Sequence, residues 1–205
     1  LIKGKYKTGF FCENNNIFEY LEPYIEKKSK KQKIILITFE KIEKKIENVE
    51  QCIFYLNFFR ELVFLTLKLK YLYSSTPGLN QSLFKKSKFS KCKYIYLQHS
   101  LCSMIMIYSK FAFDSFDAIQ AVTNYQFNEL LEIKNKRNLN YKIFKSNYLF
   151  LKKKNSTSKT KFEKTVLIAP TWNTSFFKLG CHEIICSFLK KNKISYDLRP
   201  HPMSF

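Results

Sequence analysis

Short apolar runs alternate with stretches of helical periodicity along most of the chain. Residues 34–39 form a continuous β-branched and apolar run, which is typical of a strand buried on both faces. Residues 8–13 form a shorter, aromatic, strand-like run before them. Between the two, Ile17, Leu21 and Ile25 recur at the spacing of one helix face. The first forty residues therefore predict strand, helix and strand.

The same alternation continues to the end of the chain. We expect further strands at residues 71–75, 94–97, 118–122, 166–169 and 195–199, and helices at residues 52–67, 125–133 and 182–191. Thr123 and Asn124 are placed to cap the second of these helices. Strands that alternate with helices predict an α/β fold with a parallel, doubly wound sheet.

One segment interrupts this pattern and divides the chain. Residues 151–164 are rich in Lys, Ser and Thr and have no periodicity, which is typical of a linker. We therefore expect an N-terminal domain over residues 1–150, a linker over 151–164, and a second α/β domain that begins at 165. Only the first strand–helix–strand unit of that domain lies within 165–205. The chain begins with Leu1 and stops just after an expected strand, so we expect a piece of a longer protein.

The charge of the chain is strongly positive. Among 205 residues, 36 are Lys or Arg and 16 are Asp or Glu, which gives a net charge of +20, and 45% of the residues are hydrophobic. That apolar content excludes a disordered chain. Only Arg60, Arg137 and Arg199 are Arg, whereas nucleic-acid readers favour Arg for bidentate contacts. We therefore expect no nucleic-acid partner. The excess of Lys reflects either a general bias in amino-acid composition, as an AT-rich genome would produce, or attraction to an anionic membrane face or to phosphorylated substrates.

The cysteines and the longest uncharged stretch bear on the compartment. The six Cys include no CxxC pair, and Cys181-His182-x-x-x-Cys186 has no further ligand nearby, so we expect reduced thiols and no metal. The uncharged stretch 94–109 contains Gln98, His99 and three Ser, which argues against a transmembrane helix. The first residues do not resemble a signal peptide. We expect a cytoplasmic protein.

Ligands of open parallel sheets bind beyond the carboxyl ends of the strands, and His99 falls at such a position. It follows the expected strand 94–97 and precedes a helix that we expect to begin near Leu101. A histidine there can act as a general base, and the helix N-terminus can hold phosphate oxygens. A capping or partly buried histidine that is bonded to nearby backbone is the structural alternative.

Two further clusters follow strands of the expected second domain. Thr171 offers a hydroxyl and Trp172 a flat face, although a turn with a core Trp would explain both. Arg199 and His201 follow the last strand beside two prolines, where Arg suits phosphate and a surface loop is the alternative. We expect His182 to be structural. No P-loop, GxGxxG, GxSxG or HExxH motif occurs, and Asp114 and Asp117 are expected to be solvated turn residues.

These clusters occur in an order that resembles the CDP-glycerol glycerophosphotransferase family, which builds teichoic-acid and related cell-envelope polymers. The matching segments are residues 71–79, 96–100, 116–118, 167–172 and 198–202. The resemblance implies a GT-B architecture of two Rossmann-like domains, with no metal and no cofactor. It also implies a peripheral position on the cytoplasmic membrane face. Two departures are Ser100, where most members have Gly, and residues 146–148, which replace a Gly-x-Pro-Arg type of segment.

The resemblance also implies roles for individual residues. His99 corresponds to the base, and Arg199 and His201 correspond to the Arg-x-His that contacts the donor phosphates, with His201 counted among the catalytic residues. Residues 170–172, with Thr171 and Trp172, correspond to the lining of the donor pocket, and Ser100 is counted with them and with Arg199 among the donor- or phosphate-binding residues.

The implied activity is transfer of glycerol phosphate, or a similar polyol phosphate, from a CDP-linked donor to a polymer or lipid-linked acceptor at an anionic membrane surface. We expect the 205-residue chain alone to be inactive. One alternative is a sugar-nucleotide glycosyltransferase or epimerase-like protein of the same architecture. The other is a non-catalytic basic module that binds membrane or nucleic acid.

Overall fold

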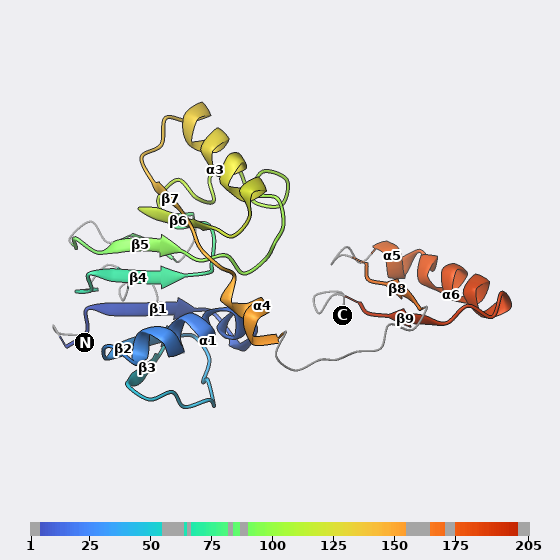
Figure 1. Ribbon diagram of the computed structural model, residues 1–205, viewed down its shortest axis with the longest axis horizontal. Coiled ribbons are helices and arrows are strands. Elements are labelled where there is room, and N and C mark those ends of the chain that lie inside the picture. The colour runs from blue at the N-terminus through green and yellow to red at the C-terminus, as the bar shows by residue number, and fades with distance from the viewer. Residues whose placement is uncertain are drawn as a thin grey trace. The chain divides into compact units, whose positions relative to one another are not determined.

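The computed structural model describes most of the chain as two compact units (Figure 1). The units are Leu1–Thr157 and Ser158–Phe205. The described residues are 5–54, 64, 67–81, 84–86, 90–154, 165–170 and 175–200.

The first unit is built on a parallel sheet of seven strands, ordered β3-β2-β1-β4-β5-β6-β7. The strands are β1 Thr8–Cys12, β2 Ile34–Thr38, β3 Val49–Ile53, β4 Tyr71–Ser74, β5 Lys93–Tyr96, β6 Ala118–Ala121 and β7 Lys142–Lys145. The prediction of a parallel, doubly wound α/β sheet is confirmed, and the strand order is consistent with a Rossmann-like domain. The order reverses between β1 and β4, which makes that position the topological switch point.

Three described helices belong to this unit: α1 Asn15–Ser29, α3 Asn124–Lys136 and α4 Leu149–Lys154. The side chain of Asn14 accepts a hydrogen bond from the Ile17 amide and caps α1. Thr123 caps α3 in the same way by accepting from the Gln126 amide. The helices expected from the spacing of residues 17–25 and from the Thr123 cap are therefore confirmed.

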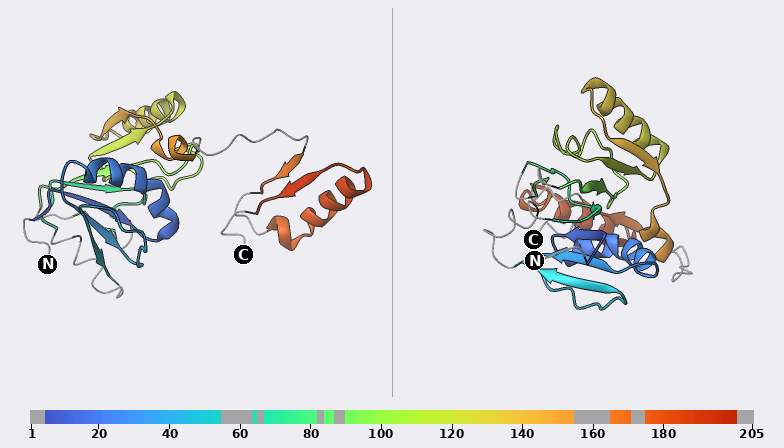
Figure 2. Two further views of the ribbon diagram at one scale, coloured as in Figure 1. Left: turned by 60° about the horizontal axis from the view of Figure 1, so that its bottom comes forward. Right: turned by 90° about the vertical axis from the view of Figure 1, so that its left-hand side faces the viewer.

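Side chains from alternating strand positions form two cores, one on each face of the sheet. In β1, Phe11 belongs to one core and Phe10 to the other. The core that contains Phe10 also contains Phe18, Leu21 and Ile25 of α1. The opposite core is covered by the connections between β3 and β7, and the right-hand view of Figure 2 shows α1 and the β4–β5 connection on opposite sides of the sheet.

The second unit contains one strand–helix–strand arrangement. Strand β8 Val166–Ile168 pairs in parallel with β9 Tyr196–Leu198, and α5 Ser175–Lys178 and α6 Cys181–Lys191 lie between them in sequence. Helix α6 begins one residue before the expected helix, and both expected strands are present. The predictions of elements in this part of the chain are therefore confirmed.

Several local predictions were wrong. The expected helix 52–67 begins inside β3, because Cys52 and Ile53 pair with β2, while Phe64 is helical and residues 55–63 lie outside the described residues. Strand β7 was not expected, and α4 continues to Lys154, inside the predicted linker.

Within the described residues, no helix combines the length and the apolar character that a membrane crossing requires.

Candidate functional site

The carboxyl ends of β1, β4 and β5 lie along one edge of the sheet, where their arrowheads point in Figure 1. Ser75 and Thr76 follow β4, and His99 lies three residues beyond the end of β5. The chain thus carries His99 to the strands beside the switch point, where open α/β sheets bind their ligands. The position expected for His99 is the one observed.

Aromatic rings surround the half-buried imidazole of His99. Its Nδ1 lies 3.1 Å from the hydroxyl of Tyr96, which is fully buried at the end of β5. The ring centroids of Tyr20 and Tyr108 lie 6.0 and 6.1 Å from that of His99, and the Tyr108 ring is perpendicular to it. Two rings from the chain near His99 and one from the distant helix α1 therefore surround this imidazole.

This environment favours the neutral form of His99. Burial lowers the pKa of His99 below 6.5, and a hydrogen bond with the Ser75 backbone opposes this shift only in part. Such a bond raises a histidine pKa when the ring donates to a carbonyl, so it uses the single N–H of a neutral imidazole. A general base needs the lone pair of the other ring nitrogen, and the Tyr96 hydroxyl lies within hydrogen-bond distance of the ring, 3.1 Å from Nδ1.

A chain of hydroxyl and thiol groups continues from His99. The Tyr96 and Tyr108 hydroxyls are 3.3 Å apart, and Tyr108 lies 3.2 Å from Ser100 Oγ, which lies 2.8 Å from Cys102 Sγ. Burial raises the pKa of Tyr108 to about 12 and that of Tyr96 well above its ordinary value. Both phenols therefore stay protonated near neutral pH. The hydroxyl of Ser100, which was expected to bind the donor or its phosphate, instead contacts Cys102 and Tyr108.

The segment after His99 differs from the prediction. Residues 101–116 form turns and bends instead of a helix from Leu101, so that expected helix N-terminus does not exist. Side chains of α3 hold the segment: Gln126 Nε2 donates to the carbonyls of Ser100 and Cys102, each at 3.1 Å. Glu129 accepts from the Met104 amide at 2.6 Å. These tertiary hydrogen bonds replace the backbone bonds of a helix.

Two hydroxyls beside His99 have no hydrogen-bond partner within the described part of the chain. They are Ser75 Oγ and Thr76 Oγ1, both buried atoms at the carboxyl end of β4. Buried polar atoms are usually satisfied, so two adjacent exceptions need an explanation. A ligand at the switch point could supply the missing hydrogen bonds. In the sequence, the signal at this position is the segment Thr76-Pro77-Gly78, which could line a cleft but is equally typical of a tight turn.

In the second unit, Arg199 follows β9 as expected. Its Nε donates to Asp197 Oδ2 at 2.8 Å, and the Arg199 and Asp197 side chains are 72% and 46% exposed. Thr171, Trp172 and His201 lie outside the described residues. The Arg199 guanidinium is thus accessible to an anion that can compete with one exposed carboxylate.

The remaining candidates have structural surroundings. His182 packs against the rings of Phe177 and Phe176, at centroid distances of 5.0 and 6.3 Å, and its Nδ1 is buried without a hydrogen-bond partner within the described residues. Asp114 and Asp117, which were expected to be solvated turn residues, lie in a turn and a bend with partly exposed side chains, and they also form ion pairs: Asp114 with Arg137, and Asp117 with two lysines.

Ion binding and similarity to known proteins add no further assignment. The described residues contain no group of three His, Cys, Asp or Glu side chains that could hold a metal ion. The cysteines are free thiols, and Cys12 and Cys92 are buried. A scan against protein-family models finds no match, and a comparison with curated proteins finds none either. The site therefore has to be interpreted from its own chemistry.

Proposed function

We propose that the chain is part of a glycerophosphotransferase that moves glycerol phosphate, or a similar polyol phosphate, from a CDP-linked donor to an acceptor hydroxyl in cell-envelope polymer synthesis. The observation that carries this proposal is the position of His99, a half-buried imidazole at the carboxyl edge of a parallel sheet, where burial lowers its pKa. The order of the matching segments, from residues 71–79 to 198–202, supplies the substrate class. In this proposal, the second unit begins a donor domain of GT-B type.

The proposed reaction is a displacement at the donor β-phosphorus. The acceptor oxygen forms a bond to that phosphorus while its proton passes to the lone pair of His99. The bond to the bridging oxygen breaks, and CMP leaves with its electron pair. Arg199 and His201 stabilise the negative charge on the phosphates. Thr171 and Trp172 line the donor pocket, and Ser100 contributes to donor or phosphate binding next to His99.

The protonation state of His99 supports this role. A base that is protonated at working pH cannot accept the acceptor's proton, and burial keeps His99 neutral. General-base assistance contributes roughly 10²–10⁴ to a rate. The unpartnered hydroxyls of Ser75 and Thr76 lie at the neighbouring strand end and are available to hydroxyls or phosphate oxygens of a substrate.

An exposed apolar loop beside the site supports contact with a membrane surface. Between β5 and β6, Ile105, Met106 and Ile107 are 46, 81 and 63% exposed. Phe111 is 53% exposed, and the guanidinium of Arg137 lies 4.4 Å from the centre of its ring. Contiguous exposed apolar groups with adjacent cations suit an anionic lipid surface, which would bring a lipid-linked acceptor to His99.

Substitution of Met106 by Asp tests this contact. The added charge opposes insertion among lipids, so we expect Met106→Asp to bind anionic vesicles at least about tenfold more weakly in a sedimentation assay. The matched control is Asn16→Asp, which adds the same charge at an exposed position in the first turn of α1 and should bind anionic vesicles as the wild type does. Equal binding of Met106→Asp and wild type would refute the loop assignment.

Release of CMP from CDP-glycerol tests the reaction itself, in the complete protein that carries this chain. We expect His99→Ala to lower the rate by about 10²–10⁴ with the fold intact. His182→Ala removes a histidine that packs against phenylalanines and should retain the rate. An unchanged rate in His99→Ala would refute the base assignment.

The same assay separates the alternatives. Turnover of a UDP- or CMP-sugar in place of CDP-glycerol would identify a sugar-nucleotide glycosyltransferase of the same architecture. Steeply salt-dependent binding to lipid or nucleic acid that His99→Ala does not change, without turnover of any donor, would identify a non-catalytic basic module.

A further inference from the structure

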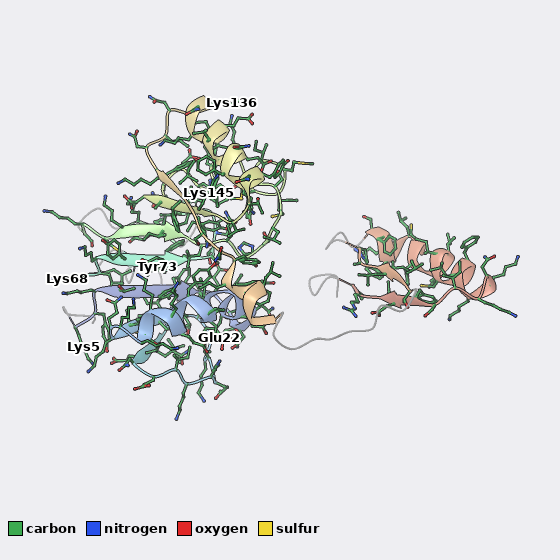
Figure 3. The ribbon with its side chains drawn as sticks, in the orientation of Figure 1. Lys5, Glu22, Lys68, Tyr73, Lys136 and Lys145 are labelled. Atoms are coloured by element: carbon green, nitrogen blue, oxygen red, sulfur yellow. The ribbon has the colours of Figure 1, made fainter. Side chains whose placement is uncertain are left out.

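The sheet face that α1 covers contains a groove beyond that helix. The groove has a volume of about 720 Å³. Its floor takes one side chain from each of five strands: Phe10, Tyr73, Ile95, Ala118 and Phe144. The rings of Phe10 and Tyr73 stack at 5.0 Å, and Figure 3 labels Tyr73 on this part of the sheet. We call this feature the sheet-face groove.

The topology explains why this face is open. The chain moves in one direction from β1 to β2 and in the opposite direction from β4 to β7, and right-handed crossovers then place the two sets of connections on opposite faces. Leu79, Met104 and Leu130 of the later connections accordingly pack in the core on the other face. Figure 1 shows α1 in front of β1 and β2 and no described helix in front of β4 and β5.

One wall of the groove is basic. Tyr24, Lys27 and Lys28 lie at positions i, i+3 and i+4 of α1, so they share one helix face, and Lys31 continues the row. The Nζ atom of Lys28 lies 5.3 Å from the centre of the Tyr73 ring, which places this ammonium group over the floor. An apolar floor and a cationic wall thus meet along one line.

The nearby carboxylates do not neutralise this wall. Glu22 and Glu26 of the same helix both contact Lys44. Among the described residues, Lys27, Lys28 and Lys31 have no ion-pair partner. The C-terminal carbonyls of a helix carry about half a negative charge, so three lysines leave the wall positive.

The far end of the groove is polar and ordered. The Tyr24 hydroxyl accepts from Gln120 Nε2 at 2.9 Å and donates to the Asn147 carbonyl at 3.2 Å. Gln120 Nε2 also donates to Ser146 Oγ at 2.6 Å. Because these groups satisfy one another, the charge that a ligand would meet lies at the lysine wall.

We propose that the sheet-face groove binds an amphiphile with one apolar chain and a phosphate head. The chain lies along the floor over β4 to β7, and the head contacts Lys27, Lys28 and Lys31. Sites of about 300–1,000 Å³ with a mainly apolar lining and a few polar groups are typical of small-molecule ligands. The lysine wall selects an anionic head, and a phosphate accepts hydrogen bonds from several ammonium groups at once. This site is separate from His99 and does not depend on the transferase proposal.

Titration calorimetry with decyl phosphate tests the proposal on the 205-residue chain. Decyl maltoside offers the same apolar chain without charge, and inorganic phosphate offers the head without the chain. We expect decyl phosphate to bind at least about tenfold more tightly than either, all below their micelle concentrations. Equal affinity for decyl maltoside would show that the lysines do not select the head and would overturn the proposal. Equal affinity for inorganic phosphate would overturn it as well.

Two variants place the binding in the groove. Lys27→Ala with Lys28→Ala should weaken decyl phosphate binding about tenfold. The matched control, Lys30→Ala with Lys33→Ala, removes the same charge from neighbouring exposed positions that do not line the groove, and it should bind as the wild type does. Ala118→Trp fills the floor and should abolish binding, with circular dichroism as the check on folding. If Ala118→Trp does not fold, the double variant Lys27→Ala with Lys28→Ala provides the test. Decyl phosphate binding as tight as that of the wild type in this double variant contradicts the proposal.

Discussion

The two ends of strands β5 and β6 carry polar groups of opposite character. At the amino ends, Asp117 accepts hydrogen bonds from the Tyr94 amide at 2.9 Å, from Lys86 Nζ at 2.7 Å and from Lys93 Nζ at 3.2 Å. At the carboxyl ends, His99 is neutral, and Ser75 Oγ beside it is buried without a partner within the described residues. One end is charged and satisfied, whereas the other is uncharged and incompletely satisfied.

This difference indicates that the polar groups at the amino ends stabilise the fold, whereas those at the carboxyl ends are available to a ligand. The Asp117 carboxylate closes the turn before β6, and three donors of the protein itself occupy most of its acceptor sites. A buried hydroxyl without a partner costs stability, and a ligand, an ion or a water that supplies the missing hydrogen bond would offset that cost. Substitutions at the amino end should therefore affect folding, and substitutions at the carboxyl end should affect turnover.

The largest stability effect is expected for Asp117→Ala. It leaves the Tyr94 amide and two lysines without their acceptor, so the free energy of unfolding should fall by about 2–3 kcal/mol in urea denaturation. CMP release by the folded fraction should stay near the wild-type rate. If Asp117→Ala is as stable as the wild type, or if it folds but loses turnover, the amino ends of β5 and β6 cannot be called structural in contrast to functional carboxyl ends.

The pH dependence of stability sharpens the same point. Burial raises the pKa of the Asp117 carboxyl, but the hydrogen bonds from Lys86 and the Tyr94 amide outweigh burial and leave it below 3.8. Since the folded-state pKa is depressed, the contribution of Asp117 is present above the unfolded pKa and is lost as the pH falls through the folded value. The stability gap between wild type and Asp117→Ala should therefore close in acid.

A smaller and opposite effect is expected for Ser75→Ala. Removal of an unpartnered buried hydroxyl should leave the free energy of unfolding unchanged or raise it by up to about 1 kcal/mol, because no hydrogen bond is lost. The kcat/KM for CMP release should fall about tenfold if this hydroxyl contacts the substrate. Destabilisation beyond about 1 kcal/mol would show that Ser75 Oγ is a structural donor or acceptor instead.

The strands that the sequence predicted are mainly central, and the two that it missed form the edges of the seven-stranded sheet. Residues 34–38 are buried along their whole length, so a continuous apolar run marked them clearly. Strand β3 contains Glu50 and Gln51, and β7 begins and ends with Lys. Edge strands are half solvated and pair on one side only, so their composition is mixed. Apolar pattern alone therefore could not identify them.

The candidate site was predictable only in part, for a related reason. His99 was identifiable because it directly follows a strand, which is local information. Tyr20 comes from the distant helix α1, and Tyr108 comes from the same β5–β6 connection as His99, so these contacts depend on helix packing and on the fold of an irregular connection. The absence of a helix at Leu101 also depends on tertiary packing, because Gln126 of α3 donates hydrogen bonds to the carbonyls of Ser100 and Cys102.

The pH profile of kcat/KM for CMP release tests the central claim most directly, because it reports the pKa of the essential base in the free enzyme. Protonation of His99 removes its lone pair, so the rate should fall on the acid side. Since burial lowers the pKa of His99, the midpoint of that fall should lie below 6.5 and should match the NMR titration of the His99 ring. A midpoint at or above 6.5, or one that differs from the NMR value, would contradict the assignment of His99 as the base.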